Sequence, residues 1–166
     1  MKKVVYLSLG SNLGDRSAHL QAAIEGLAST GKILAVSSIY ETEPVGAAAR
    51  QPKFLNCALA LETELMPRQL LSATQALEHA QGRRRIKSGA PRTIDIDIVF
   101  FGSSLVCTAD LVIPHPLMHA RRFVLEPLAE IAPEARNPAL RKTVRELRDE
   151  LPPGQAVHKL AKIRLP

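Results

Sequence analysis

Two aspartates at alternate positions are the residues of this sequence best suited to chemistry. Asp95 and Asp97 lie in the segment 92–101, RTIDIDIVFF, in which apolar and polar residues alternate. A period of two is typical of a β-strand, so both carboxylates point the same way, roughly 7 Å apart at about 3.3 Å per residue. Paired carboxylates on a rigid strand, preceded by Arg92, suit one or two hard divalent cations. The alternative is a solvent-exposed strand face whose acids only aid solubility.

Basic residues gather immediately before the aspartate strand. Arg83, Arg84, Arg85, Lys87 and Arg92 fall within ten positions. The chain has 22 Lys and Arg against 16 Asp and Glu, a net charge of +6, which indicates either nucleic acid or an anionic small molecule as partner. The position of the cluster beside two carboxylates favours a phosphate-bearing substrate, whereas in isolation it would be interpreted as a solvated loop.

Length and composition are those of a soluble globular protein. The 166 residues predict a single domain over 1–166, with 46% hydrophobic and 23% charged residues. Cys57 and Cys107 have neither metal-ligand spacing nor a disulfide framework. The apolar start, residues 4–9, is too short for a signal peptide, and no run could span a membrane. We therefore expect a cytoplasmic protein.

The pattern of elements predicts what must position the aspartates. We expect main strands at 3–9, 32–42, 54–64 and 92–101, with helices up to about residue 28 and over 66–81. Loops at 44–52 and 82–91 separate them, each with glycine, and could close over a site. Further elements are short strands at 105–108 and 111–113 and helices at 121–131 and 140–151. The pattern leaves open whether the tail after Gly154 pairs as an edge strand.

The core order β-α-β-β-α-β predicts the fold class. It favours an α+β, ferredoxin-like sandwich: a mostly antiparallel sheet with helices packed on it and C-terminal additions. This fold hosts many functions, so it says little about chemistry.

Seven short segments together resemble one family, the 6-hydroxymethyl-7,8-dihydropterin pyrophosphokinases of folate biosynthesis. Each segment is moderately specific, whereas their order and spacing, from residue 3 to about residue 133, are highly specific. The segments are LSLGSNLGD (7–15), SIYET (38–42), FLN (54–56), GRRR (82–85), APRTIDID (90–97), IPHP (113–116) and RRFVLEPL (121–128). The resemblance implies transfer of the terminal pyrophosphate of ATP to the pterin hydroxymethyl group, with release of AMP.

The resemblance assigns roles around the aspartates. Asp95 and Asp97 would hold two Mg²⁺ ions, one of which can polarise the attacking hydroxyl. Arg83 and Arg92 would join them as catalytic residues, answering the charge of the transferred group. The residues implied to bind ATP are Gln75, Glu78, Arg83, Arg85, Arg92, Ile98, Val112, His115 and Arg121, with Ile98 and Val112 contacting adenine through their backbones.

The resemblance also implies a pterin site. A flat heteroaromatic ring requires apolar rings on its faces and a few polar groups at its edge. Phe54 and Phe123 match the stacking positions, and Asn56 the amide that contacts the edge. The residues implied to bind the pterin are Thr42, Pro44, Val45, Phe54, Asn56, Asp95 and Phe123. Core packing is the plainer interpretation of both phenylalanines, but alternation places Phe54 on the face of Asn56, not of Leu55.

Some positions depart from the family pattern, and two other functions stay open. Gly89 stands where many members have an aromatic residue, Asp110 where some have a basic nucleotide contact, and Glu43 where proline is frequent. A palm-type nucleotidyltransferase also places paired aspartates on a strand. A ferredoxin-like RNA-binding module would explain the charge, although it would need aromatic residues on its central strands. The leading interpretation expects small-molecule substrates, no nucleic acid or membrane partner, and a monomer.

Overall fold

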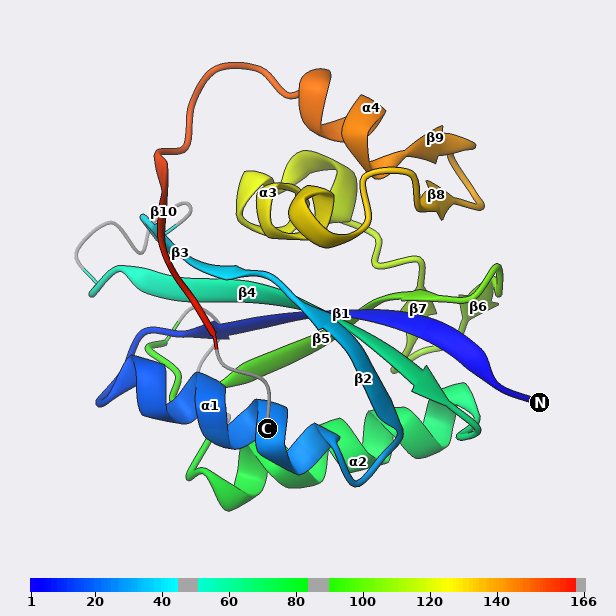
Figure 1. The fold of residues 1–166 in the computed structure, drawn as a ribbon, viewed down its shortest axis with the longest axis horizontal. Coiled ribbons are helices and arrows are strands. Elements are labelled where there is room, and N and C mark those ends of the chain that lie inside the picture. Colours follow the sequence, from blue (N-terminus) through cyan, green and yellow to red (C-terminus); the bar gives the residue numbers. More distant parts are fainter. Residues whose placement is uncertain (45–50, 84–89, 164–166) are drawn as a thin grey trace.

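The main sheet of the protein is antiparallel and has helices on both faces (Figure 1). The computed structural model describes residues 1–44, 51–83 and 90–163. Six strands of this part of the chain form the sheet, in the order β10-β3-β4-β1-β5 with β2 also paired to β4. They are β1 (Lys3–Ser11), β2 (Lys32–Val36), β3 (Ser38–Thr42), β4 (Phe54–Thr63), β5 (Asp95–Phe101) and β10 (Val157–Lys162). The order β5-β1-β4-β2/β3 is that of a ferredoxin-like sandwich, so the predicted fold class is confirmed.

Helices α1 (Arg16–Leu27) and α2 (Pro67–Ala80) cover one face of the sheet (Figure 1). Asp15 caps α1 by accepting a hydrogen bond from the Ala18 amide, and Pro67 occupies the first turn of α2, where a missing N–H costs nothing. Alternate residues of the central strands, such as Leu7, Leu9, Cys57 and Leu59, pack against the buried side of these helices. The strand residues in between face the other side of the sheet.

Helix α3 (Arg122–Ile131) covers the opposite face, and α4 (Val144–Asp149) packs on the outer side of α3 (Figure 1). They bury a smaller core that includes Val99, Phe100, Val124 and Leu128. Before α3 come the short strands β6 (Val106–Cys107) and β7 (Val112–Ile113) and a 3-10 turn, Met118–Ala120. A hairpin of β8 (Arg136–Asn137) and β9 (Lys142–Thr143) precedes α4.

Three details of the predicted elements were wrong. The strand expected over 32–42 is two strands that break at Ser37, whose hydroxyl donates to the Ser38 carbonyl and accepts from the Ala58 amide. The last helix starts at Val144 rather than 140, capped by Thr143 and Glu146. Alternation in the aspartate strand fails after Ile98, where a register shift turns Phe100 to the α3 side. The tail does pair as an edge strand, β10 against β3.

Candidate active site

Small residues on the central strand β1 leave a hollow between the sheet and the start of α3. The antiparallel pairing places Gly10 directly between Asn56 of β4 and Asp95 of β5, and Ser8 beside Asp97. Because these residues share a face, and because Gly10 and Ser8 fill little space, the larger polar side chains on either side border an open cavity of about 230 Å³. The residues that line it are Ser8, Gly10, Thr42, Glu43, Pro44, Gln51, Phe54, Asn56, Arg92, Asp95, Asp97, Arg121 and Phe123.

This first cavity has apolar rings and a fixed amide. Phe54 and Asn56 both line it, whereas Leu55 and Cys57 are buried in the core, as the alternation predicted. The amide nitrogen of Asn56 donates to the Thr42 hydroxyl at 2.6 Å, which fixes the side chain. Gly10 is required for this approach: a Cβ here would lie 2.7 Å from the Asn56 Oδ1. Phe123 borders the cavity from α3, with the Arg121 guanidinium 5.5 Å from its ring centroid.

A second cavity, of about 550 Å³, lies on the other side of the two aspartates. It extends between α2 and the segment that leads from β6 to β7. Asp95 and Asp97 line both cavities, so the carboxylates form a floor common to the two. The residues of the second cavity are Leu71, Thr74, Gln75, Glu78, Arg83, Asp95, Ile96, Asp97, Ile98, Ala109, Asp110, Leu111, Val112, His115 and Pro116.

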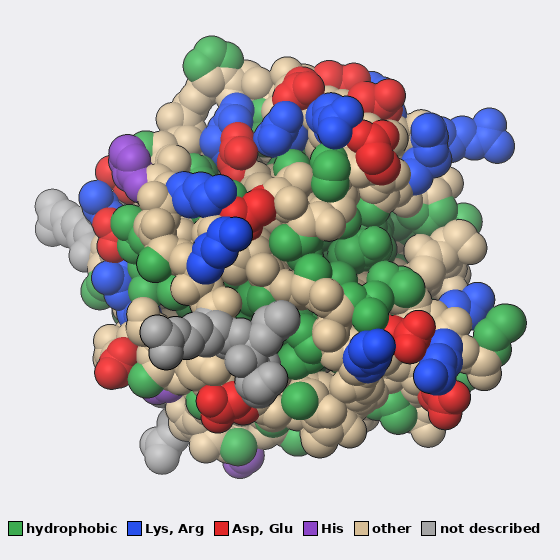
Figure 2. Space-filling view, in the orientation of Figure 1, with side chains coloured by type: hydrophobic (Ala, Val, Ile, Leu, Met, Phe, Trp, Pro, Cys, Tyr) green, Lys and Arg blue, Asp and Glu red, His purple; other side chains and the backbone are tan. Residues whose placement is uncertain are grey.

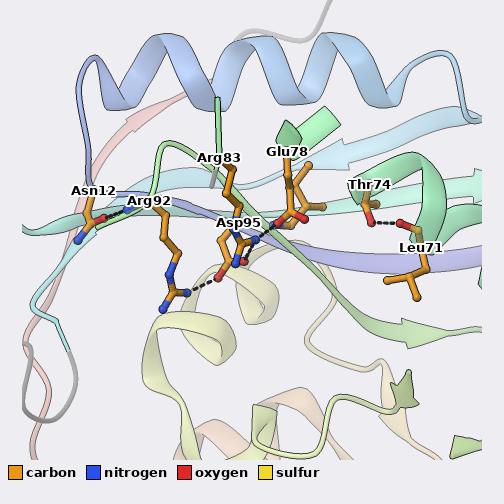
Figure 3. Close-up of polar contacts among 8 residues, drawn as sticks. Asn12, Leu71, Thr74, Glu78, Arg83, Arg92 and Asp95 are labelled. Carbon is orange, nitrogen blue, oxygen red and sulfur yellow. Dashed lines mark hydrogen bonds and ion pairs between the residues drawn. The ribbon is translucent and has the colours of Figure 1, made fainter. Parts of the chain in front are cut away.

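Two arginines bind the carboxylate of Asp95, one from each end of the segment that joins α2 to β5, as Figure 3 shows. Arg83 Nη1 donates to Oδ1 at 2.6 Å, and Arg92 Nη1 donates to Oδ2 at 2.7 Å. Arg83 is also paired with Glu78 of α2, whose carboxylate accepts the amide N–H of Ile96 at 3.0 Å. Both carboxylate oxygens of Asp95 therefore accept hydrogen bonds from arginine side chains. Glu78 connects Arg83 to β5, because it contacts both Arg83 and the Ile96 amide.

Asn12 holds the end of the loop that carries Arg92. Its side-chain Oδ1 accepts a hydrogen bond from the backbone N–H of Arg92 at 2.7 Å (Figure 3). Its backbone N–H donates to the Arg92 carbonyl at 3.0 Å. Its side-chain nitrogen reaches Gln51 and the Pro52 carbonyl. The contacts of Asn12 are between segments far apart in the sequence, so no local pattern indicates them.

Negative charge accumulates around Asp97. Burial raises the pKa of this carboxyl to about 7, with further contributions from Asp95 and Glu78, while Arg121 and Arg83 act in the opposite direction. Burial also raises the pKa of Glu78 and lowers the pKa of His115, the latter aided by the positive charge of Arg121. Ionised carboxylates repel one another in this partly enclosed site. A bound cation would remove that repulsion.

The two aspartates fit a Mg²⁺ ion whose remaining ligands are water and substrate phosphates. Among the described residues no group of three or more His, Cys, Asp or Glu side chains is arranged to hold a metal ion. Mg²⁺ typically binds through one or two carboxylates and completes its shell with water and substrate phosphates, so the pair Asp95 and Asp97 is sufficient. A metal that requires a complete protein cage would not fit.

Most of the predicted site residues meet at these two cavities. The predicted pterin residues described by the structure all line the first cavity, and Gln75, Glu78, Arg83, Ile98, Val112 and His115 line the second. Arg92 and Arg121, predicted to bind ATP, line the first cavity beside the aspartates. Val45 and Arg85 lie outside the described residues, as does Gly89. The positions agree with the assigned roles, which stay predictions.

Sequence reasoning missed several lining residues. Ser8, Gly10 and Gln51 line the first cavity, and Leu71 and Thr74 the second. The period of two in β1 could have placed Ser8 and Gly10 on one face. Gln51 had no comparable signal, because a loop has no fixed period.

Comparison with known proteins identifies the family. The family profile described as 7,8-dihydro-6-hydroxymethylpterin-pyrophosphokinase (HPPK) matches residues 6–133. The chain belongs to this family. A 2-amino-4-hydroxy-6-hydroxymethyldihydropteridine pyrophosphokinase of Bacillus subtilis is 43% identical over 141 residues, 84% of this chain and 84% of the relative. The protein of the same name from Pseudomonas aeruginosa is 47% identical over 137 residues, 81% of this chain and 83% of the relative. The resemblance inferred from the sequence motifs is thus confirmed.

Solved HPPK structures share the fold. The Plasmodium falciparum HPPK-DHPS structure with pterin and p-hydroxybenzoate aligns with a TM-score of 0.72 at 18% identity. It covers 90% of this chain, and this chain spans 42% of that longer one. At this identity the likeness supports the HPPK fold alone.

Proposed function

We propose that the two cavities bind the two substrates of a pyrophosphoryl transfer in folate biosynthesis. ATP supplies its terminal pyrophosphate, 6-hydroxymethyl-7,8-dihydropterin accepts it at the hydroxymethyl oxygen, and AMP leaves. The observation that carries this proposal is the common floor: Asp95 and Asp97 line both cavities at once. A ligand in each cavity would meet the other at these carboxylates, as an in-line transfer between two bound substrates requires.

The pterin would occupy the first cavity. Its ring would lie between Phe54 and Phe123, and its polar edge would face Asn56, which the Thr42 hydroxyl holds in place at 2.6 Å. The nucleotide would occupy the second cavity, with its base against the backbone of Ile98 and Val112 and its phosphates directed toward Asp95 and Asp97.

The arginines would change partners when ATP binds. Arg83 and Arg92 neutralise Asp95 in the structure described above. Phosphate oxygens are strong acceptors for guanidinium groups, so an arriving triphosphate would draw Arg83 and Arg92 from Asp95. The freed carboxylate, with Asp97, would then hold Mg²⁺. When bound, Mg²⁺ would neutralise phosphate charge and polarise the attacking hydroxyl.

Transfer then requires positioning more than covalent catalysis. The hydroxymethyl oxygen would attack the β-phosphorus as the bond from that phosphorus to the oxygen of the α-phosphate breaks, which leaves AMP, and the hydroxyl proton would be released to solvent. Arg83, Arg92 and Arg121 would stabilise the charge that moves onto the transferred and leaving groups. His115, whose pKa is lowered by burial, would reach the phosphates as a neutral donor near pH 7.

A nucleic-acid partner finds no support on the face drawn in Figure 2. Lys and Arg side chains lie among Asp and Glu side chains there, rather than in a patch of one sign (Figure 2). Among the described residues, several basic side chains are paired with acidic ones, as in Arg145–Glu134, Lys142–Glu150 and Lys159–Glu130. The described residues contain no helix long and apolar enough to cross a membrane. The monomeric state and the single domain over 1–166 stay predictions.

Product analysis tests the proposal. Incubation with ATP, Mg²⁺ and 6-hydroxymethyl-7,8-dihydropterin should yield AMP and the pterin pyrophosphate in equal amounts, as measured by ion-exchange chromatography. Formation of ADP would indicate transfer of a single phosphoryl group, and a cyclic nucleotide would indicate palm-type chemistry. Either product, or no turnover, would refute the proposal.

A further inference from the structure

Arg16, the first residue of α1, contacts the end of β3 and the residue that precedes β4. Its Nη1 donates to the Lys53 carbonyl at 2.8 Å, and its Nη2 reaches the Glu41 carboxylate at 3.2 Å. Glu41 lies next to the last residue of β3, and Lys53 lies next to the first residue of β4. A single guanidinium therefore bridges the two points between which the chain leaves the sheet and returns.

The bridge lies beside residues that line the first cavity. Thr42 and Phe54 face each other as the last pair of the β3–β4 ladder, and both border the cavity. Fraying of β3 from β4 would begin at this pair, because the described residues beyond it, 43–44 and 51–53, add no further pair to the ladder. A planar guanidinium has its donors at fixed spacing, so two contacts hold Glu41 and Lys53 at a set separation and oppose fraying.

Arg16 does not belong to the cavity itself. Successive strand residues point to opposite faces, so the side chain of Glu41 points away from the face of Thr42. Arg16 approaches from α1, which covers the face opposite to the cavity (Figure 1). Its side chain is 29% exposed and that of Glu41 is 27% exposed, so the pair is partly shielded from solvent.

We propose that Arg16 is a positioning residue for the pterin substrate. Its contacts fix the end of β3, and so hold Thr42 and the Asn56 amide in the conformation that binds the pterin. This conformation is already present in the ligand-free protein. This inference rests on the proposed function of the first cavity. Pre-ordering of a binding segment lowers the cost of association, so the loss of Arg16 should weaken pterin binding, while chemistry in the bound complex stays intact.

The test measures pterin affinity with a non-hydrolysable ATP analogue present, by calorimetry. Arg16→Ala should raise the Kd for 6-hydroxymethyl-7,8-dihydropterin about five-fold, the size expected for a partly shielded charge-assisted contact. The Kd for the analogue and kcat at saturating pterin should not change. Arg16→Lys, which retains a single donor group, should fall between wild type and Arg16→Ala. Glu41→Gln should add little once Arg16 is alanine, because the two act through one contact.

A matched control and a substrate-independent measurement complete the design. Arg145→Ala also removes one surface arginine and one ion pair, with Glu134, but lies in α4, and should leave pterin affinity unchanged. Hydrogen exchange of the free protein should speed up in Arg16→Ala at the ends of β3 and β4 and not elsewhere in the sheet. Unchanged exchange there, or an unchanged pterin Kd, would overturn the inference. If wild type itself neither binds the pterin nor forms AMP, the proposed function fails, and the exchange result still decides whether Arg16 holds the ends of β3 and β4 together.

Discussion

Asp97 should lower the stability of the ligand-free protein, and the effect should depend on pH. Its pKa rises from an ordinary 3.8 to about 7, chiefly because the carboxyl is buried and secondarily because Asp95 and Glu78 are near. Since a tenfold change in proton affinity corresponds to about 1.4 kcal/mol, the ionised form costs about 4 kcal/mol at most. Part of this cost depends on the charges around Asp97 rather than on its burial alone, so we expect Asp97→Asn to recover about 1–3 kcal/mol.

The sign follows from which state holds the proton. Below pH 3.8 the carboxyl is protonated in both the folded and the unfolded chain, and it costs nothing. Between pH 3.8 and about 7 the folded chain keeps a proton that the unfolded chain has lost, so the stability of wild type falls as pH rises. Above about pH 7 the full cost remains. The difference in unfolding free energy between Asp97→Asn and wild type should therefore grow from near zero at pH 4 to its maximum at pH 8.

Urea unfolding followed by circular dichroism, in EDTA and without nucleotide, measures this difference from pH 4 to pH 9. The same substitution at Asp110 is the control. Hydrogen bonds from Arg68 lower the pKa of that exposed carboxyl, so Asp110→Asn should not stabilise the protein at any pH. Asp97→Asn should also lose turnover in the AMP assay. A pH-independent difference, or a variant less stable than wild type at pH 8, would refute the inference that ionisation of Asp97 destabilises the ligand-free fold.

Two further substitutions test the division of labour between the cavities. Arg92→Ala should lower kcat by about a hundredfold or more, the usual cost of removing one donor that stabilises developing charge. The pterin Kd should change much less. Steady-state kinetics and calorimetry measure the two quantities, and a large change in Kd with little change in kcat would mean that Arg92 mainly positions the substrate. Gly10→Ala should weaken pterin binding about tenfold, because the new Cβ displaces Asn56 and breaks its bond to Thr42. Nucleotide affinity should be unaffected, and Gly154→Ala, with open space around it, is the matched control. Equal pterin affinity in Gly10→Ala and wild type would exclude a role for the Asn56 amide.

Much of the fold could be predicted because its signals are local. Alternation placed Phe54 with Asn56 and Asp95 with Asp97, and the order of elements gave the sandwich. The failures were also physical. A strand that breaks at Ser37 and a register shift after Ile98 depend on what β4 and β1 offer as partners, and no single segment carries that information.

By itself, the sequence determined the family, the chemical types in the site and the faces on which the strand residues lie, because each of these is carried by residue identity and short spacing. Tertiary structure alone decided that Gly10 brings Asn56 and Asp95 into one row, that Arg83 and Arg92 bind the same carboxylate, and that Asp97 lies where burial and neighbouring charges raise its pKa. Burial and charge act through space between segments distant in sequence, so they exist only once the chain has folded.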